Sequence, residues 1–559
     1  MMINYKDPII IENIELLLQG YFNPDLPPIF SYKKYLNKIQ DLFEGFINST
    51  YNEKFNKDET PSYTYSNGIE PIVYYDFKKN NTLREMMLPC FKSYIIFVYK
   101  TINVYETLFK QIYTSELYKE YISCSNSNLL SNNKFNIYND YNNIIGEYDG
   151  YLYQIYANKK NRDLRFMLNE KKVLDMIGTK QYIYKVDIES FYPNIYTHLL
   201  RNLQNNDIFS KLGCGNYFDF LDEYNMKINS DQTKGIVTGI YSSEISSELL
   251  MIAIDKEIKD LLNKDGQVGY IRYVDDMIFA TNSKDDFSRI FPMIQEILNK
   301  YRLRVNPNKI TEQSSISFKS YTDIFSIKRE FTLLENTDKK LVISNSTFNH
   351  IKYTIEQLVM HKDISALKSY LSFIKSYAVK NNLLFENDDY ILFLSKYLII
   401  LSTDEPLFST RCYMILDVLI EKYKNTADNI CDALYKKTEV VDLHFNNTML
   451  QIWHYYILIK NKKLNFDSIK QKDFKDINPL IVTFLIEFGE DCDKIFNEIK
   501  SVFCKESHHK SSKYVFMKEI MCSRWWLPVM SIINKNNLKL NKYFENDNFD
   551  KFYLDLNCR

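Results

Sequence analysis

The stretch Val268-Gly-Tyr-Ile-Arg-Tyr-Val-Asp-Asp-Met-Ile-Phe-Ala-Thr281 indicates two short apolar strands joined by a tight turn. The turn carries Asp275 and Asp276, and adjacent carboxylates between apolar strands are costly unless they bind a cation. An aromatic-x-Asp-Asp pattern alone is a weak signal, because the 559 residues include 45 Tyr and 37 Phe. The hairpin position distinguishes this pair from the other Asp-Asp pairs, which are typical of helix starts or solvated faces.

A further acidic residue ends the strand predicted upstream of this hairpin. The run Tyr182-Ile-Tyr-Lys-Val-Asp187 is rich in β-branched and aromatic residues, which is typical of a buried strand. Residues 242–262 place apolar side chains at helical spacing, and Ser283 precedes another helix that extends to about Tyr301. The order strand, helix, hairpin, helix, strand predicts an α+β fold, a palm-type sheet with its helices on one face.

Three carboxylates are therefore expected to meet at one end of this sheet. Asp187 and Asp275 are 88 residues apart in the chain, yet the ends of neighbouring strands lie close together. Carboxylates arranged in this way suit two divalent ions that assist nucleotidyl transfer, one at a 3′-hydroxyl and one at the departing pyrophosphate. Because all the ligands are oxygen atoms, Mg²⁺ is the expected cofactor, with Mn²⁺ as the alternative.

Composition excludes several classes of protein. The 70 Lys and Arg against 71 Asp and Glu give a formal net charge of −1, so bulk basicity cannot hold this chain on nucleic acid and any binding must use local patches. Nine cysteines without a C-x-x-C pair favour neither a zinc site nor a disulfide framework. No export signal and no apolar run near the about 20 residues of a membrane span are found. We expect a soluble, cytoplasmic protein with no membrane partner.

Four segments together resemble the catalytic motifs of reverse transcriptases, in the right order over 122 residues. Asp187-x-x-x-Phe191-Tyr192 resembles the first motif and Tyr273-Val-Asp-Asp276 resembles the third. The second is matched by Gly235-Ile-Val-Thr-Gly239-x-x-x-Ser243, with Val237 where the family has proline, and the fourth by Leu303-x-Val305-Asn306-x-x-Lys309.

The residues in and around these motifs are similar to those of the abortive-infection (AbiK-like) reverse transcriptases of bacteria. The similar stretches are Asp187 to His198, Gly239 to Leu249 and Asp323 to Ser326. That resemblance implies a phage-defence polymerase that makes DNA from dNTPs without a template, primed from a protein tyrosine. It also implies a reverse-transcriptase-like fingers/palm core followed by a large all-α C-terminal domain, a HEAT-like helical array.

The predicted organisation follows from this resemblance and from the sequence pattern. Residues 1–150 form an N-terminal and fingers region with an Asn-rich insertion at 123–150, residues 151–335 form the polymerase core, and residues 340–559 form the helical domain. Within 340–559 the strands stop, and helical periods recur. The periods lie near 347–362, 364–380, 388–402, 408–424, 446–462, 478–488, 490–504 and 512–523.

The resemblance assigns roles to individual residues. Asp187 and Asp275 are expected to bind the metal ions directly, with Asp276 in support. Tyr192 matches the residue whose ring excludes a ribose 2′-hydroxyl, although a core aromatic is the alternative. Gly239 is expected to line the nucleotide pocket, where a glycine permits close backbone approach.

Cations are expected around the triphosphate and the pyrophosphate. Lys309 can donate a proton to pyrophosphate or simply belong to a basic strand. Within 151–185, where basic residues outnumber acidic ones by five, the candidates for triphosphate binding are Lys160, Arg162 and Arg165, against the alternative of a solvated basic face. Arg84 and Pro89 loosely resemble the family's finger segment.

Two alternatives stay open at this stage. One is a conventional RNA-templated reverse transcriptase of a retroelement or retron, which Val237 and the long helical region disfavour. The other is an inactive polymerase-like scaffold that binds a partner through its helices. The expected partners are dNTPs and self-synthesised single-stranded DNA attached to the protein, and a homo-oligomer or a noncoding RNA partner is left open. The priming residue is not identified; Tyr32, Tyr35 and Tyr51 are among the candidates.

Overall fold

We describe a computed structural model of the chain over residues 8–34, 69–79, 82–114, 176, 178, 180–265, 268–314, 324–470, 473–507, 520 and 523–535. The Asn-rich insertion, the predicted triphosphate ligands Lys160, Arg162 and Arg165, and the priming candidates Tyr35 and Tyr51 lie outside these residues, as does most of the helix predicted at 512–523. The described parts are mostly helical and contain three small sheets.

The central sheet has four antiparallel strands in the order β4-β5-β3-β6. Its strands are β3 (Tyr182–Asp187), β4 (Gly269–Tyr273), β5 (Asp276–Thr281) and β6 (Thr311–Ser314). The predicted strand and hairpin are confirmed, since β3 and the β4–β5 pair occupy the expected residues. The hairpin places β5 antiparallel to β3, so that the last residue of β3 lies opposite the first residue of β5 at one edge of the sheet.

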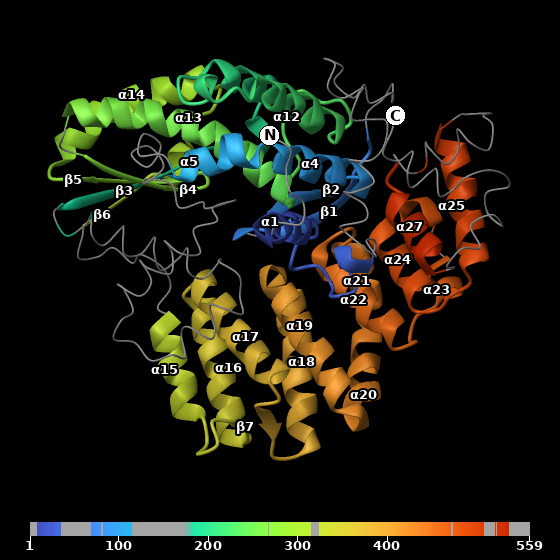
Figure 1. Cartoon of the computed structure of the whole chain (residues 1–559). Coiled ribbons are helices and arrows are strands. Elements are labelled where there is room, and N and C mark those ends of the chain that lie inside the picture. Colours follow the sequence, from blue (N-terminus) through green and yellow to red (C-terminus); the bar gives the residue numbers. More distant parts are fainter. Residues whose placement is uncertain are drawn as a thin grey trace.

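Two long helices, α13 (Tyr241–Asp265) and α14 (Lys284–Lys300), cover one face of this sheet, coloured green in Figure 1. On that face the rings of Tyr184 and Phe287 stack with centroids 3.8 Å apart, and Tyr184 belongs to the main hydrophobic core. The opposite face carries a small separate cluster of Ile183, Ile271 and Ile278. Alternation along β3 thus directs the larger side chains toward the helices.

Helix α14 begins where the sequence predicts it. The Ser283 side chain accepts a hydrogen bond from the Asp286 amide, and the Asp286 carboxylate accepts one from the Ser283 amide, which makes a capping box. Between β3 and α13 lie α10 (Phe191–Asn194), α11 (Thr197–Asn202) and α12 (Gly215–Lys227).

The N-terminal region supplies a second sheet, the antiparallel pair β1 (Ile72–Phe77) and β2 (Leu83–Leu88). It is flanked by α1 (Pro8–Gln19), α4 (Phe91–Asn103), the π-helical turn Tyr105–Phe109 and α5 (Lys110–Thr114). Sequence pattern alone favours an extended segment near Ile72 to Tyr75, where β1 lies, whereas it does not predict β2. Both strands share the main hydrophobic core with the palm.

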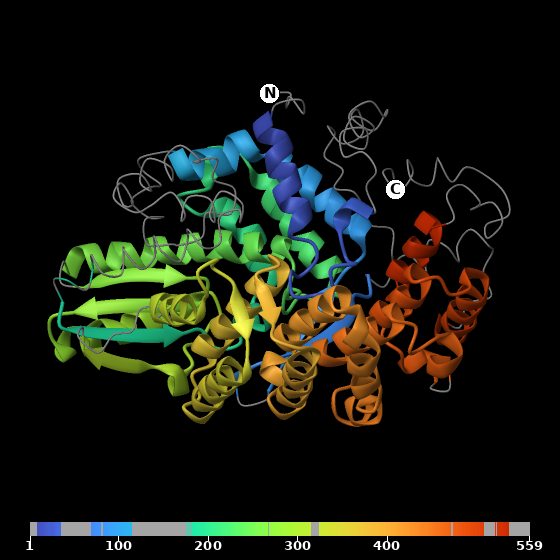
Figure 2. The same ribbon diagram turned by 90° about the horizontal axis from the view of Figure 1, so that it is seen from below.

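The C-terminal half is an irregular array of helices, drawn yellow to red in Figures 1 and 2. Its helices are α15 (Ile324–Leu334), α16 (Asn345–Met360), α17 (Ile364–Val379), α18 (Asp388–Asp404), α19 (Ser409–Lys422), α20 (Lys424–Tyr435), α21 (Thr438–His444), α22 (Met449–Lys460), α23 (Phe466–Lys470), α24 (Pro479–Glu487), α25 (Cys492–Ser507) and α27 (Trp526–Lys535). No described helix has both the length and the apolar character needed to cross a bilayer.

One part of the prediction for this half is wrong. The strands do not stop at residue 340, because β7 (Leu341–Ile343) and β8 (Leu383–Phe385) form a two-stranded parallel sheet between the helices. Each strand has only three residues, which is too short for alternation to reveal it from sequence. Their pairing brings the start of α16 close to the end of α17.

Strand β1 lies against the helical half by backbone pairing. The Tyr75 amide donates to the Asn447 carbonyl at 2.9 Å, and the Asn478 side-chain amide donates to the Val73 carbonyl at 3.0 Å. The ring of Phe77 packs edge-on against Phe445, with centroids 6.0 Å apart. Residues far downstream therefore complete the open edge of the β1–β2 sheet.

Candidate active site

Three carboxylates meet where β3 ends and β5 begins. Asp187 lies directly opposite Asp276 in the antiparallel register, and Asp275 occupies the two-residue turn between β4 and β5. The Ile188 amide donates to the Asp275 carbonyl at 3.3 Å, which ties the turn to the end of β3. The hairpin thus brings Asp275 beside Asp187 despite the 88 residues between them.

The negative charge of this cluster is poorly compensated. Burial raises the pKa of Asp275, and the nearby Asp187 raises it further, while Lys309 and Arg84 oppose the shift. Burial, Asp275 and Asp187 together raise the pKa of Asp276 to about 6. A bound cation would relieve this repulsion. The all-oxygen donor set fits a hard divalent cation such as Mg²⁺.

Lys309 is the cation that pairs with this cluster in the absence of metal. Its Nζ lies 2.9 Å from both carboxylate oxygens of Asp187. The loop before β6 carries it there, because the Asn306 amide donates to the Asp187 carbonyl at 2.8 Å. Among the described residues, no three His, Cys, Asp or Glu side chains form a preassembled metal cluster. A metal ion at Asp187 must therefore compete with Lys309.

Tyr192 lies beside the carboxylates at the start of the segment after β3. Its half-buried ring belongs to α10 and packs edge-on against Phe191, with centroids 5.4 Å apart. Burial raises its pKa, and the neighbouring Glu244 and Asp275 add to the shift, while a hydrogen bond with Ser247 lowers it. The ring therefore lies near both α13 and Asp275, a location that suits the predicted exclusion of a 2′-hydroxyl.

Gly239 sits in a close contact that no other residue would fit without strain. Its φ is +99°, and a Cβ built on it would lie 2.6 Å from Met86 Cε of β2. The preceding Thr238 carbonyl accepts from the Met87 amide at 2.9 Å, and Val237 is fully buried. The glycine motif is thus held against the β1–β2 sheet.

Two exposed cations near the cluster come from the β1–β2 hairpin, Lys78 directly after β1 and Arg84 on β2. Arg84 lowers the pKa of Asp275. The pKa of Lys78 is lowered by burial and by Arg84 and Lys309, while Asp275 and Asp187 act in the opposite direction. Arg84 was singled out by resemblance, whereas Lys78 carried no sequence signal, because only the hairpin's packing brings it to the palm. They are the triphosphate candidates that the described residues offer.

Residues 136–336 match the family model described as reverse transcriptase (RNA-dependent DNA polymerase). The chain carries a reverse transcriptase domain. A curated relative, the retron Ec83 reverse transcriptase of Escherichia coli, is 25% identical over 200 residues, covering 33% of this chain and 64% of the relative. The chain therefore aligns with less than two thirds of the length of this relative.

Solved telomerase structures also resemble the chain. Apo telomerase from Candida tropicalis is 15% identical over 78% of this chain and 72% of its own, with a TM-score of 0.28. Telomerase from Candida albicans in complex with a telomeric RNA fragment is 12% identical over 67% of this chain and 62% of its own, with a TM-score of 0.26.

Proposed function

We propose that this protein is a DNA polymerase of the reverse transcriptase type, a nucleotidyltransferase that joins dNTPs. The observation that carries the proposal is the placement of Asp187 opposite Asp276, with Asp275 in the adjoining turn. This arrangement lies inside the region that matches the reverse transcriptase family.

In this proposal the described residues divide the work around one nucleotide. Asp187 and Asp275 would hold two divalent cations with Asp276 in support, and such cations, when bound, activate the 3′-hydroxyl and neutralise the leaving pyrophosphate. Lys78 and Arg84 attract the triphosphate. Tyr192 excludes the ribose 2′-hydroxyl, and Lys309 is placed to transfer a proton to pyrophosphate.

The finer proposal concerns the template. We infer that the enzyme works without a template, primes from one of its own tyrosines and serves in phage defence, as the resemblance to abortive-infection enzymes implies. The net charge of −1 supports this, because a polymerase that grips a long duplex needs a more basic surface. Val237 at the position of the usual proline supports it as well.

A templated enzyme is the second candidate, and the similarity to a retron reverse transcriptase favours it. In that case the chain would copy an RNA partner, and added template and primer would be required for synthesis. The two candidates share the same carboxylates and differ in what supplies the 3′-hydroxyl.

One experiment tests both levels of the proposal. The purified protein is incubated with labelled dNTPs and Mg²⁺, with and without template and primer, and resolved on a denaturing gel. Label that migrates with the protein in the absence of oligonucleotide, and that nuclease trims only to a stub, supports protein priming. A strict need for template and primer supports the retron-like enzyme.

Asp275→Asn should abolish incorporation in either case. Asp389→Asn is the matched control, because Asp389 also belongs to an Asp-Asp pair but is exposed in the first turn of α18. Incorporation that persists in Asp275→Asn at the wild-type rate would contradict the proposed site.

A further inference from the structure

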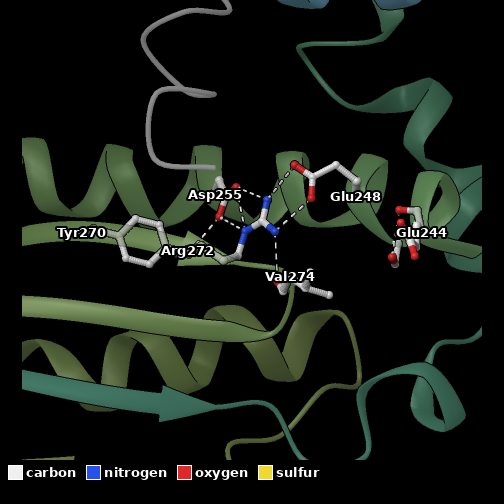
Figure 3. A network of polar contacts seen from close by, with 7 residues as sticks. Glu244, Glu248, Asp255, Tyr270, Arg272 and Val274 are labelled. Atoms are coloured by element: carbon white, nitrogen blue, oxygen red, sulfur yellow. Dashed lines mark hydrogen bonds and ion pairs between the residues drawn. The ribbon is translucent and has the colours of Figure 1, made fainter. Parts of the chain in front are cut away.

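An arginine lies buried beneath the turn that carries Asp275. Arg272, on β4, is completely inaccessible to solvent, and its two carboxylate partners on α13 are nearly so, Asp255 at 0% and Glu248 at 5% exposure. Figure 3 shows the guanidinium enclosed between these two side chains and the turn. Burying three charges costs several kcal/mol per ion, on the order of what their attraction returns. The net contribution of these ion pairs to the free energy of folding is therefore small, and stability alone does not explain the network.

The guanidinium uses every donor it has. Nε donates to Asp255, and Nη2 donates to Asp255 at 2.7 Å and to Glu248 at 3.0 Å. Nη1 donates to Glu248 at 3.0 Å and, with its remaining hydrogen, to the Val274 carbonyl at 2.9 Å. Four of the five N–H groups are therefore fixed by one helix, and the fifth is directed at the turn.

Arg272 remains protonated and positively charged. Burial alone would lower its pKa, but Asp255 and Glu248 raise it well above its ordinary value. Tyr270 also donates from its hydroxyl to Asp255 at 2.8 Å, which holds that carboxylate in place. Helix α13, through these contacts, presents a rigid, charged donor to the backbone of the turn.

The turn needs such support because its backbone is strained. Val274 has a φ of 54°, a left-handed conformation that disfavours β-branched side chains and that a two-residue hairpin ordinarily gives to glycine or asparagine. The conformation persists only where neighbouring contacts over-determine it. Here the Val274 carbonyl is held by Arg272, and the next carbonyl, that of Asp275, is held by the Ile188 amide.

We infer that Arg272 is a positioning residue, which fixes the strained Val274-Asp275 turn so that the Asp275 carboxylate faces Asp187. The inference rests on the proposed role of Asp275 in cation binding. It extends the site to a side chain that touches neither nucleotide nor metal and acts through one backbone carbonyl. It also gives α13 a function beyond packing, because both carboxylates that orient Arg272 come from that helix.

Mn²⁺ binding tests the inference without any turnover. Arg272→Lys keeps the charge but cannot reproduce the fork, and electron paramagnetic resonance titration of Mn²⁺ should show binding weakened about tenfold or more, the loss of one charge-assisted hydrogen bond. Arg272→Lys combined with Val274→Gly should regain most of that loss, since glycine adopts a positive φ without strain.

Tyr301→Phe is the matched control. Tyr301 donates to Glu257 on the same helix at 2.7 Å, so its loss weakens α13 packing at a distance from the turn, and Mn²⁺ binding should stay at the wild-type level. If Arg272→Lys does not fold, Glu248→Gln tests the same network, because it puts an amide against the guanidinium.

Wild-type Mn²⁺ affinity in Arg272→Lys, or no recovery on adding Val274→Gly, would overturn the inference. So would weakening of equal size in Tyr301→Phe. These outcomes are distinct from failure of the proposed function, which would appear as a wild-type protein that incorporates no nucleotide.

Discussion

Replacing Lys309 with methionine should make the carboxylate cluster bind divalent cations more tightly. Lys309 Nζ lies 2.9 Å from both oxygens of Asp187, so it occupies the electrostatic position that a metal ion would take. Methionine keeps much of the side-chain volume and removes the charge. The change therefore relieves a competitor without opening a cavity.

The size of the effect follows from exposure. The Lys309 side chain is 60% exposed while that of Asp187 is 14% exposed, so water screens the pair, and two unit charges about 4 Å apart in water interact by only about 1 kcal/mol. That energy corresponds to roughly a fivefold change in a binding constant. We expect Mn²⁺ affinity to rise about fivefold at low ionic strength and by less in high salt.

The assay is a Mn²⁺ titration followed by electron paramagnetic resonance, at pH 8, which lies above the pKa of about 6 of Asp276. Lys300→Met is the control, because Lys300 is 63% exposed and pairs with Glu257 at 2.6 Å away from the cluster. Unchanged or weaker Mn²⁺ binding in Lys309→Met would refute the competition argument. Nucleotide incorporation is a separate readout, and it should fall if Lys309 supplies a proton to pyrophosphate.

Three further outcomes are expected. Tyr192→Ala should allow labelled ribonucleotides to be incorporated, whereas Tyr192→Phe should not, because the ring that fills the space is retained. Gly239→Ala should lower the free energy of unfolding in urea by roughly 1–2 kcal/mol. In a Met86→Ala background the same change should cost less, since the 2.6 Å overlap is gone and only the φ of +99° remains. Asp276→Asn should raise the melting temperature of the metal-free protein at pH 7.5. Its pKa of about 6 lies above the ordinary 3.8, so ionisation opposes folding increasingly between these two values and fully above the higher one. The gain over wild type should vanish only below about pH 3, where the group is protonated in both the folded and the unfolded chain.

The part of the fold that sequence predicts is the part with strong local signals. The β3 strand has a continuous β-branched and aromatic run, and the start of α14 has a capping box at Ser283. In contrast, β2 reads Leu-Arg-Glu-Met-Met-Leu, which has no β-branched residue and becomes a strand only by pairing with β1. Helix α20, at 424–435, lies between the helices predicted at 408–424 and 446–462 and is not among the predicted elements.

The residues of the candidate site also differ in whether a local sequence signal reveals them. Asp187, Asp275 and Asp276 are found from sequence because they end or join recognisable strands. Lys78 and Arg272 are not, since their partners are distant in the chain and are brought near only by packing. Arg272 meets Asp255 and Glu248, 17 and 24 residues earlier on a helix, and no local pattern marks that meeting. The HEAT-like character of the helical half stays a prediction.

The backbone pairing of β1 with the helical half bears on where this chain can be shortened. A shortened chain ending after the reverse transcriptase match at residue 336 would leave the Val73 carbonyl and the Tyr75 amide without Asn478 and Asn447. The exposed edge would then be open to pairing with other chains. The β1–β2 hairpin that carries Lys78 and Arg84 would lose these contacts as well. The smallest unit that keeps these contacts therefore combines segments far apart in the sequence. A fragment chosen only to include the catalytic motifs would lack some of those segments.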